Sequence, residues 1–205
     1  MDIDVVVVGG GPTGLLLAGE LRLGGAEVIV LERLAAPTGL SKALGVIGRG
    51  AQTLHYRGLL DRFDGAATTG ARFARFAHVG GIPLNVGPML DQLPPGQAPP
   101  TLMAPQARVE QVLEQWAGEL GAHLRRGHEV TAVDQTDDLV TLQVSGPDGP
   151  YRLTAGYVVG CDGARSLVRK QAGIGFPGTE ATQVSRFGDG SLIAPGQPLR
   201  GLDLR

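Results

Sequence analysis

The chain has little of what covalent cross-links, membrane insertion or nucleic-acid binding require. It contains one cysteine, Cys161, which has no partner for an internal disulfide, so we expect a reducing compartment. The net charge is −2, and lysine occurs only at Lys42 and Lys170, which argues against nucleic acid or an anionic membrane as a partner. The apolar run Ile3–Val8 is too short to span a bilayer and follows acidic residues, unlike a signal peptide. These absences predict a soluble, cytoplasmic protein.

The sequence also lacks the patterns of hydrolases, metalloenzymes and disulfide reductases. It shows no serine elbow, no spacing of metal ligands and no motif with paired carboxylates. The single cysteine cannot support dithiol chemistry, and we expect it to be a small packed residue. The histidines are scattered and are interpreted as surface or structural residues: His55, His78, His123 and His128. No catalytic side chain and no metal site is predicted.

Glycine, in contrast, is abundant, with 33 residues, and several glycines lie in the first clear motif. The β-branched run Ile3–Val8 ends in glycines and predicts a buried strand of a parallel sheet. Pro12–Leu23 carries leucine and alanine at helical spacing and is stopped by Gly24 and Gly25. Glu27–Leu31 is a second β-branched run. Strand, tight glycine turn, helix and strand together predict a βαβ unit.

The turn after the first strand has the pattern Gly-x-Gly-x-x-Gly. Gly9 allows the tight turn, Gly11 lets a pyrophosphate approach the backbone, and Gly14 lets the helix pack on the strand. The start of the helix adds N–H groups and a positive dipole end. Glu32 lies at the end of the next strand, where a carboxylate can accept both hydroxyls of an adenosine ribose and would repel a 2′-phosphate. The pattern favours FAD or NAD over NADP; the alternative is that Glu32 and Arg33 form a solvated strand end.

A second motif follows another apolar segment. Residues 160–169 read Gly-Cys-Asp-Gly-Ala-Arg-Ser-Leu-Val-Arg, after a predicted buried strand at Tyr157–Gly160 and before a predicted helix at Ser166–Gln171. Ligands collect at the carboxyl ends of parallel strands, so Asp162 can accept from sugar or ribityl hydroxyls, and the arginines of the segment can meet phosphate. The alternative is that Asp162 only caps the helix that follows.

Other segments predict a helix and a meander. Pro105–Leu120 is amphipathic, with Pro105 in its first turn and a buried face formed by Val109, Val112, Leu113, Trp116 and Leu120. Alternation of apolar and polar residues predicts a three-stranded antiparallel meander over Glu129–Asp134, Val140–Ser145 and Tyr151–Ala155. Gly50–Leu60 has a weaker helical pattern, and residues 71–103 predict irregular strands that leave the sheet layer.

Three segments in this order resemble class A flavoprotein monooxygenases, the relatives of para-hydroxybenzoate hydroxylase. They are the Gly-Gly-Gly-Pro-Thr-Gly turn, the pair Glu32-Arg33, and Cys-Asp-Gly-Ala-x-Ser-x-Val-Arg. The resemblance is closest to the polyketide-antibiotic branch, such as angucycline, anthracycline and rifamycin hydroxylases, and runs from about Ile3 to about residue 185. It implies an α/β fold: a Rossmann-like FAD-binding domain with a parallel sheet, the antiparallel meander, and the beginning of a β-rich substrate domain.

The resemblance also implies ligands and site residues. FAD would be the bound cofactor, and NAD(P)H would be a transient co-substrate. The substrate would be a small aromatic molecule, which the enzyme hydroxylates with O2. Arg49 would lie near FAD and the nicotinamide, and Gln106 near the ribityl chain; a surface arginine and a helix-start glutamine are the alternatives. The Val130 backbone would lie beside the adenine, and Asp162 would serve both cofactors. The full set is Gly9, Gly11, Thr13, Gly14, Glu32, Arg33, Arg49, Gln106, Val130 and Asp162.

The expected organisation has four segments. Residues 1–70 and 104–175 form the FAD-binding domain, 71–103 an excursion into the substrate domain, and 176–205 the start of a truncated substrate domain. The family's third motif, Gly-Asp followed by Ala-Ala-His and a proline, is absent, and Gly188-Asp189 does not match it. We therefore expect an N-terminal portion whose remainder is missing or is a second chain. A non-catalytic FAD- or NAD-binding fragment and an NAD-dependent dehydrogenase stay open as other functions.

Overall fold

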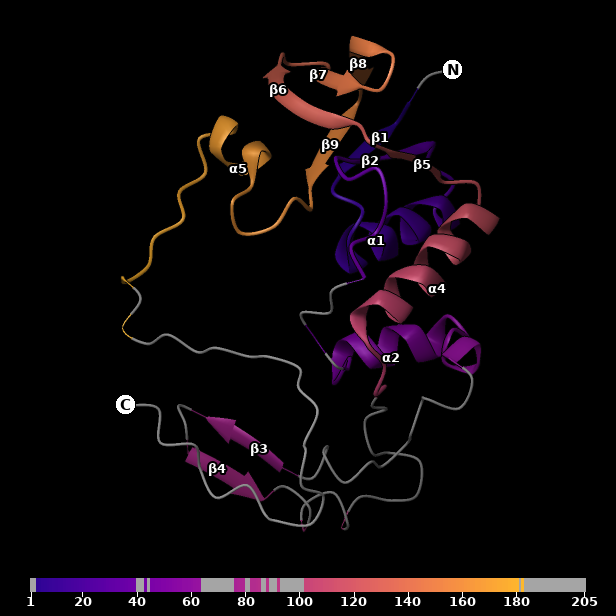
Figure 1. The fold of residues 1–205 in the computed structure, drawn as a ribbon, viewed down its shortest axis with the longest axis vertical. Coiled ribbons are helices and arrows are strands. Elements are labelled where there is room, and N and C mark those ends of the chain that lie inside the picture. The colour runs from indigo at the N-terminus through magenta and orange to yellow at the C-terminus, as the bar shows by residue number, and fades with distance from the viewer. Residues whose placement is uncertain are drawn as a thin grey trace, which may run out of the picture. The chain divides into compact units, whose positions relative to one another are not determined.

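The chain divides by its own contacts into two compact units, Met1–Ile174 and Gly175–Arg205. The helices and strands described below all belong to the first unit (Figure 1). In the second unit, residues 175–180 and 182 are described, and they form neither helix nor strand. The computed structural model describes residues 3–39, 43, 45–63, 76–79, 82–85, 88, 92, 102–180 and 182. The division into four segments stays a prediction.

A parallel sheet forms the centre of the first unit. Its order is β5-β2-β1-β9, and each neighbouring pair is parallel. The strands are β1 (Val5–Val8), β2 (Val28–Glu32), β5 (His123–Arg126) and β9 (Tyr157–Gly160). Val6 and Val7 of the central strand β1 have no exposed surface, which is why this run is continuously apolar. The predicted βαβ unit is confirmed.

Alternate residues of the sheet face two different layers. On one face, valines of β1 and β2 pack against the helices α1 (Pro12–Leu23) and α4 (Gln106–Glu119) through Ala18 and Ala117. On the other face, residues such as Val6 and Leu31 pack against the meander through Leu142. The sheet is therefore buried on both faces, as the period of two along a strand allows.

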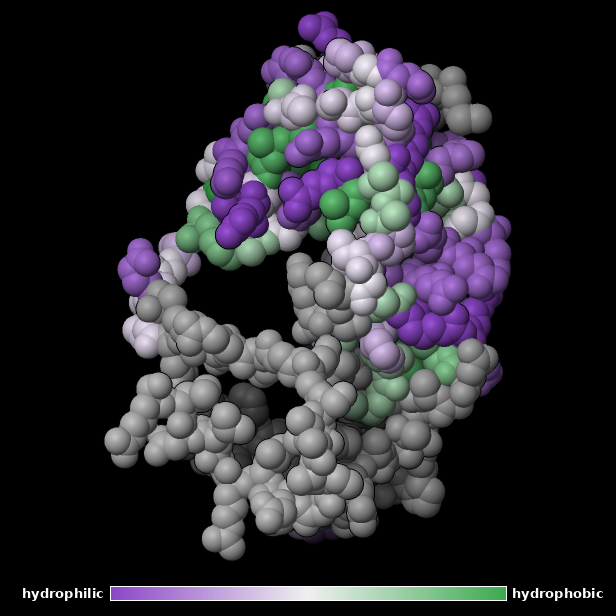
Figure 2. Space-filling view, in the orientation of Figure 1, coloured by the Kyte–Doolittle hydropathy of each residue, from purple (hydrophilic) through white to green (hydrophobic). Residues whose placement is uncertain are grey.

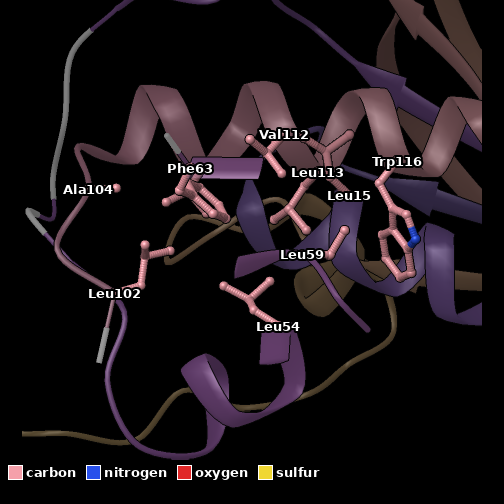
Figure 3. Packing of buried hydrophobic residues seen from close by; sticks show 10 residues of the cluster. Leu15, Leu54, Leu59, Phe63, Leu102, Ala104, Val112, Leu113 and Trp116 are labelled. Carbon is pink, nitrogen blue, oxygen red and sulfur yellow. The ribbon is translucent and has the colours of Figure 1, made fainter. Parts of the chain in front are cut away.

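Beneath α4, a second set of short helices closes a hydrophobic core (Figure 3). These are α2 (Arg49–Tyr56) and the 3-10 helix η1 (Leu60–Phe63), so the helix predicted at 50–60 is confirmed only in its first part. Ten buried residues form this core: Leu15, Leu54, Leu59, Phe63, Leu102, Ala104, Val109, Val112, Leu113 and Trp116. Four of the five residues predicted for the buried face of α4 belong to this core; Leu120 packs against it while partly buried. Pro105 is the N-cap of α4 and not part of its first turn.

The meander is confirmed and covers the face of the sheet opposite α1 (Figure 1). Its strands pair antiparallel in the order β6-β7-β8, and their bounds are Glu129–Gln135, Val140–Gly146 and Gly149–Ala155. A register shift lies between Val130 and Ala132. Apart from this layer, β3 (Phe76–Val79) and β4 (Ile82–Asn85) form an antiparallel hairpin within the segment predicted to contain irregular strands; most of that segment lies outside the described residues.

Two features of the sheet differ from the sequence prediction. The strand β5 was not predicted, because its sequence His-Leu-Arg-Arg has one apolar residue and no alternating pattern. It is held in place by parallel pairing with β2. The strand β9 was predicted to be buried, but Tyr157 is 72% exposed. The reason is its position at the edge of the described sheet, where it pairs with β1 alone.

The described surface is mixed in character. Figure 2 shows hydrophilic residues over much of one face of the first unit, with hydrophobic areas between them. Among the described residues, no helix is both long and apolar enough to cross a bilayer.

The close contact between α1 and α4 generates a prediction about stability. A Cβ built on Gly19 of α1 would lie 2.1 Å from the Trp116 ring, whereas one on Gly118 of α4 would meet nothing within 4 Å. We expect Gly19→Ala to lower the free energy of unfolding by about 1–3 kcal/mol through overpacking. Gly118→Ala, the matched control, should raise it by about 0.5–1 kcal/mol because alanine favours a helix. Denaturant unfolding measures both; equal shifts of the same sign would contradict this packing.

Candidate functional site

The glycine-rich turn joins β1 to α1, and two of its glycines are required by close contacts. Gly9 has φ +111°, and a Cβ there would lie 2.4 Å from the carbonyl oxygen of Cys161. A Cβ on Gly14 would lie 2.0 Å from the carbonyl oxygen of Gly9. The predicted roles of Gly9 in the tight turn and of Gly14 in helix–strand packing are therefore confirmed.

Gly11 has a different environment, because it borders open space. A Cβ on Gly11 would meet nothing within 4 Å, and the residue is the extended N-cap of α1, with no side-chain cap. Pro12 follows at the first helical position, where a missing N–H costs nothing, and Thr13 is exposed beside it. The backbone at the start of α1 is thus accessible to a ligand.

Glu32, the last residue of β2, is fixed against this turn. Its Oε2 accepts a hydrogen bond from the Gly10 N–H at 2.7 Å, and its Oε1 accepts one from the Leu34 N–H at 2.9 Å. The carboxylate is bound to the backbone and does not form a freely solvated strand end. Each carboxylate oxygen has a second lone pair, so Glu32 can still accept from a ligand.

A cavity of about 500 Å³ lies beside the turn. Ligand cavities typically enclose about 300–1,000 Å³, so this volume suits a nucleotide portion. The lining brings together five predicted site residues, Gly9, Glu32, Arg33, Val130 and Asp162. The complete lining is Val8, Gly9, Leu31, Glu32, Arg33, His128, Glu129, Val130, Thr131, Asp162, Arg165 and Leu167. Residues from β1, β2, β6 and the β9–α5 connection therefore share one cavity.

Asp162 follows β9. It caps the helix α5 (Leu167–Gln171) and also lines the cavity. Its Oδ2 accepts from the N–H groups of Leu167 at 2.6 Å and Val168 at 3.3 Å, which confirms the capping interpretation. Its Oδ1 is buried and has no hydrogen-bond partner within the described part of the chain. A buried acceptor without a partner is costly, but a ligand hydroxyl would reach Oδ1 only after the atoms that cover it moved.

Arg49 and Gln106 do not line this cavity. Arg49 is exposed at the start of α2, and Gln106 begins α4, where its Nε2 donates to Glu110 Oε1 at 2.7 Å. The segments before the two helices are joined by an isolated bridge between Val46 and Leu102. The bridge links the segments that precede the two helices, and the cofactor roles of Arg49 and Gln106 stay predictions.

Sequence reasoning missed four residues near the turn. His128, interpreted as surface or structural, lines the cavity with its Nδ1 at 2.9 Å from Tyr151 Oη. Glu129 and Thr131 line the cavity as well, and only the approach of β6 to the end of β2 reveals this. Gly10 occupies a variable position of the glycine pattern, so the pattern gave no signal for it. Of the other histidines, His55 and His123 are exposed, while the side chain of His78 lies outside the described residues.

Cys161 is half-buried beside Gly9 and packs against the core on the α1 side. Burial raises the pKa of its thiol, and the charge of Asp162 raises it further. The thiol therefore stays protonated at neutral pH, as expected for a packed residue. No cluster of three potential metal ligands occurs among the residues that the structure describes.

Comparison with known proteins identifies the family. The FAD binding domain family matches residues 2–194. The chain is 49% identical over 180 residues to 12-dehydrotetracycline 5-monooxygenase/anhydrotetracycline 6-monooxygenase of Streptomyces rimosus. The alignment covers 88% of this chain and 34% of that protein. It is 42% identical over 196 residues to rifampicin monooxygenase of Streptomyces venezuelae, covering 96% of the chain and 39% of that protein.

A solved structure agrees with these relatives. The ternary complex of aklavinone-11 hydroxylase with FAD and aklavinone matches with a TM-score of 0.68 and 33% identity, over 83% of this chain and 35% of that chain. The chain thus spans about a third of the length of the relatives it matches. The resemblance to flavin-dependent hydroxylases of polyketides is confirmed. The chain belongs to the FAD binding domain family of the flavin-dependent monooxygenases, and FAD is its cofactor.

Proposed function

We propose that this chain is the FAD-binding portion of an NAD(P)H- and O2-dependent hydroxylase that acts on a polycyclic phenolic or polyketide substrate. The observation that carries the proposal is the position of Glu32, whose carboxylate is held against the glycine turn at the rim of the cavity. Backbone amides next to an acid at this spacing suit the diphosphate and ribose of an adenine nucleotide.

The residues of the site fit the adenosine diphosphate half of FAD. The open space in front of Gly11 accommodates the diphosphate, with Thr13 and the start of α1 beside it. Glu32 accepts from the ribose hydroxyls. Arg33 and Val130 line the same cavity, and the adenine would lie beside them.

The remaining site residues are proposed to serve the other half of the cofactor. Asp162 lines the cavity, and its carboxylate would accept from a hydroxyl of the ribityl chain if a small local movement uncovered the buried Oδ1. Arg49 and Gln106 would then lie toward the flavin and the incoming nicotinamide. When bound, FAD supplies the transfer of electrons from NAD(P)H to oxygen, while this chain binds and orients it.

The substrate pocket would involve other parts of the full-length protein. We propose that residues 71–103 and 176–205 belong to a substrate domain, and that 1–70 and 104–175 form the FAD-binding domain. Relatives named for tetracycline and rifampicin substrates support a polyketide ligand. The rest of the protein, on this chain's continuation or on a second chain, would complete the pocket.

Cofactor content and turnover test the proposal. The purified chain should be yellow and should release FAD on denaturation. Its intact mass should be measured as well, to identify the chain that is tested. A phenolic polyketide should stimulate its NAD(P)H oxidation when the remaining portion is present. A colourless protein that binds NAD alone would favour a dehydrogenase. Bound FAD without stimulated oxidation would favour a non-catalytic binding fragment.

Gly11→Val tests the diphosphate position. The valine side chain would occupy the space in front of the turn, so we expect FAD binding to be abolished in a fluorescence-quenching titration. Gly118→Val adds the same bulk at an exposed helix position and should bind FAD normally. Unchanged FAD affinity in the Gly11 variant would place the diphosphate elsewhere.

Glu32→Ala tests the ribose position. The substitution removes a charge-assisted acceptor, so we expect FAD binding to weaken by about 1–3 kcal/mol. The same titration measures the change, and far-UV circular dichroism checks that the variant is folded. An affinity equal to that of the wild type would show that the ribose lies elsewhere.

A further inference from the structure

The cavity is lined by two elements from different layers of the fold. Val130 and Thr131 belong to β6 of the meander, whereas Leu167 belongs to α5, which follows the sheet strand β9. The distance between β6 and α5 therefore affects the width of the cavity. We propose that Gln171, at the end of α5, is a positioning residue that holds α5 against β6. The inference rests on the proposed function, which places FAD in this cavity.

The first observation is a hydrogen bond between the two elements. The Val133 N–H of β6 donates to Gln171 Oε1 at 2.5 Å. Among the described strands β6 pairs with β7 alone, so the bond to α5 uses the other edge of β6. Without Gln171, this N–H on a strand edge would be left to water. The side chain of Gln171 thus connects the helix directly to the backbone of the meander.

The second observation is the character of the other contacts between α5 and β6. Leu167 and Val168 of α5 and Val133 of β6 are partly buried and pack against the same hydrophobic core. Hydrophobic contact is non-directional, so it keeps two elements together without fixing their register. A hydrogen bond, in contrast, requires a particular distance and direction. The bond to Gln171 therefore fixes where the end of α5 lies along β6.

The third observation is that the start of α5 is held by its own segment. Asp162 Oδ2 accepts from the Leu167 N–H at 2.6 Å. Ser166 Oγ accepts from the Arg169 N–H at 2.9 Å. These bonds stay within the segment that follows β9, and they do not reach β6. Loss of the Gln171 bond should therefore leave the helix formed but freer to move relative to β6.

The connection should affect the two halves of FAD differently. The adenosine diphosphate half is proposed to lie against the glycine-rich turn and Glu32, whereas Asp162 and the segment that leads into α5 would serve the other half. In the wild type, Gln171 holds α5 in place before the cofactor arrives. Without this bond, FAD would have to order α5 on binding, and such ordering lowers affinity. ADP lacks the flavin half, so its binding would not require this ordering.

Gln171→Met tests the inference. Methionine keeps the approximate length and the helix preference of glutamine, but its sulfur is only a weak acceptor. We expect FAD affinity, measured by fluorescence quenching, to fall about threefold to tenfold, the value of one hydrogen bond. ADP affinity, measured by calorimetry, should stay within about twofold of the wild type because ADP does not need α5 to be ordered.

Two further variants serve as controls. Gln171→Glu keeps an acceptor at the same reach and should retain the FAD affinity of the wild type within about twofold. Gln115→Met makes the same change at an exposed glutamine of α4, which is not part of the cavity lining. It removes a bond of 3.0 Å from Gln115 Nε2 to Glu119 Oε1 within one helix, so both affinities should stay unchanged.

Amide hydrogen exchange by NMR tests the hydrogen bond without any ligand. The Val133 amide should be protected in the wild type and in Gln171→Glu, and it should exchange faster in Gln171→Met. The His128 amide, just before β6, donates to the Glu32 carbonyl at 3.0 Å and should exchange equally in all three proteins. An unprotected Val133 amide in the wild type would contradict the inference even if Gln171→Met failed to fold.

Three binding results would overturn the inference while the wild type still binds FAD, so that the proposed function stands. The first is a Gln171→Met variant with the FAD affinity of the wild type. The second is an equal loss of FAD and ADP affinity, which would mean that Gln171 only stabilises the fold. The third is a Gln171→Glu variant as weak as Gln171→Met. A wild type that binds neither FAD nor ADP would remove the proposed function and this inference with it.

Discussion

The site depends on how closely the start of α1 approaches the end of β1. Gly14 allows this approach, because any side chain there would overlap the Gly9 carbonyl. Gly9 in turn allows the β9 end to lie against the turn, since its missing side chain leaves room for the Cys161 carbonyl. Three strand ends therefore meet around one turn. Glu32 on one side and Asp162 on the other both line the cavity that results.

Much of this arrangement was predictable because the residues that build it act locally. The bounds of α1 agree with the prediction, since Pro12 favours a helix start and Gly24 ends it. The meander was recognisable from alternation of apolar and polar residues over its three strands. The turn glycines and Glu32 were recognisable because their spacing is set by one βαβ unit.

The features that were not predictable depend on tertiary contacts. The strand β5 has a polar sequence and is defined by its partner β2. His128, Glu129 and Thr131 reach the cavity only because β6 starts beside the end of β2, a position that no local pattern indicates. The sequence allows two roles for Asp162, as a cap of the following helix and as an acceptor of cofactor hydroxyls. The structure confirms the cap, because one carboxylate oxygen accepts from the backbone of α5, and the cofactor role stays a prediction.

The central claim is that the glycine-rich turn binds the diphosphate of FAD and that Glu32 binds its ribose. A crystal structure of this chain soaked or grown with FAD tests the claim most directly. The account predicts phosphate oxygens against the Gly11 backbone and a ribose hydroxyl within hydrogen-bond distance of a Glu32 carboxylate oxygen. Ordered FAD bound away from this turn, or bound here with Glu32 turned out of reach of the ribose, would contradict it.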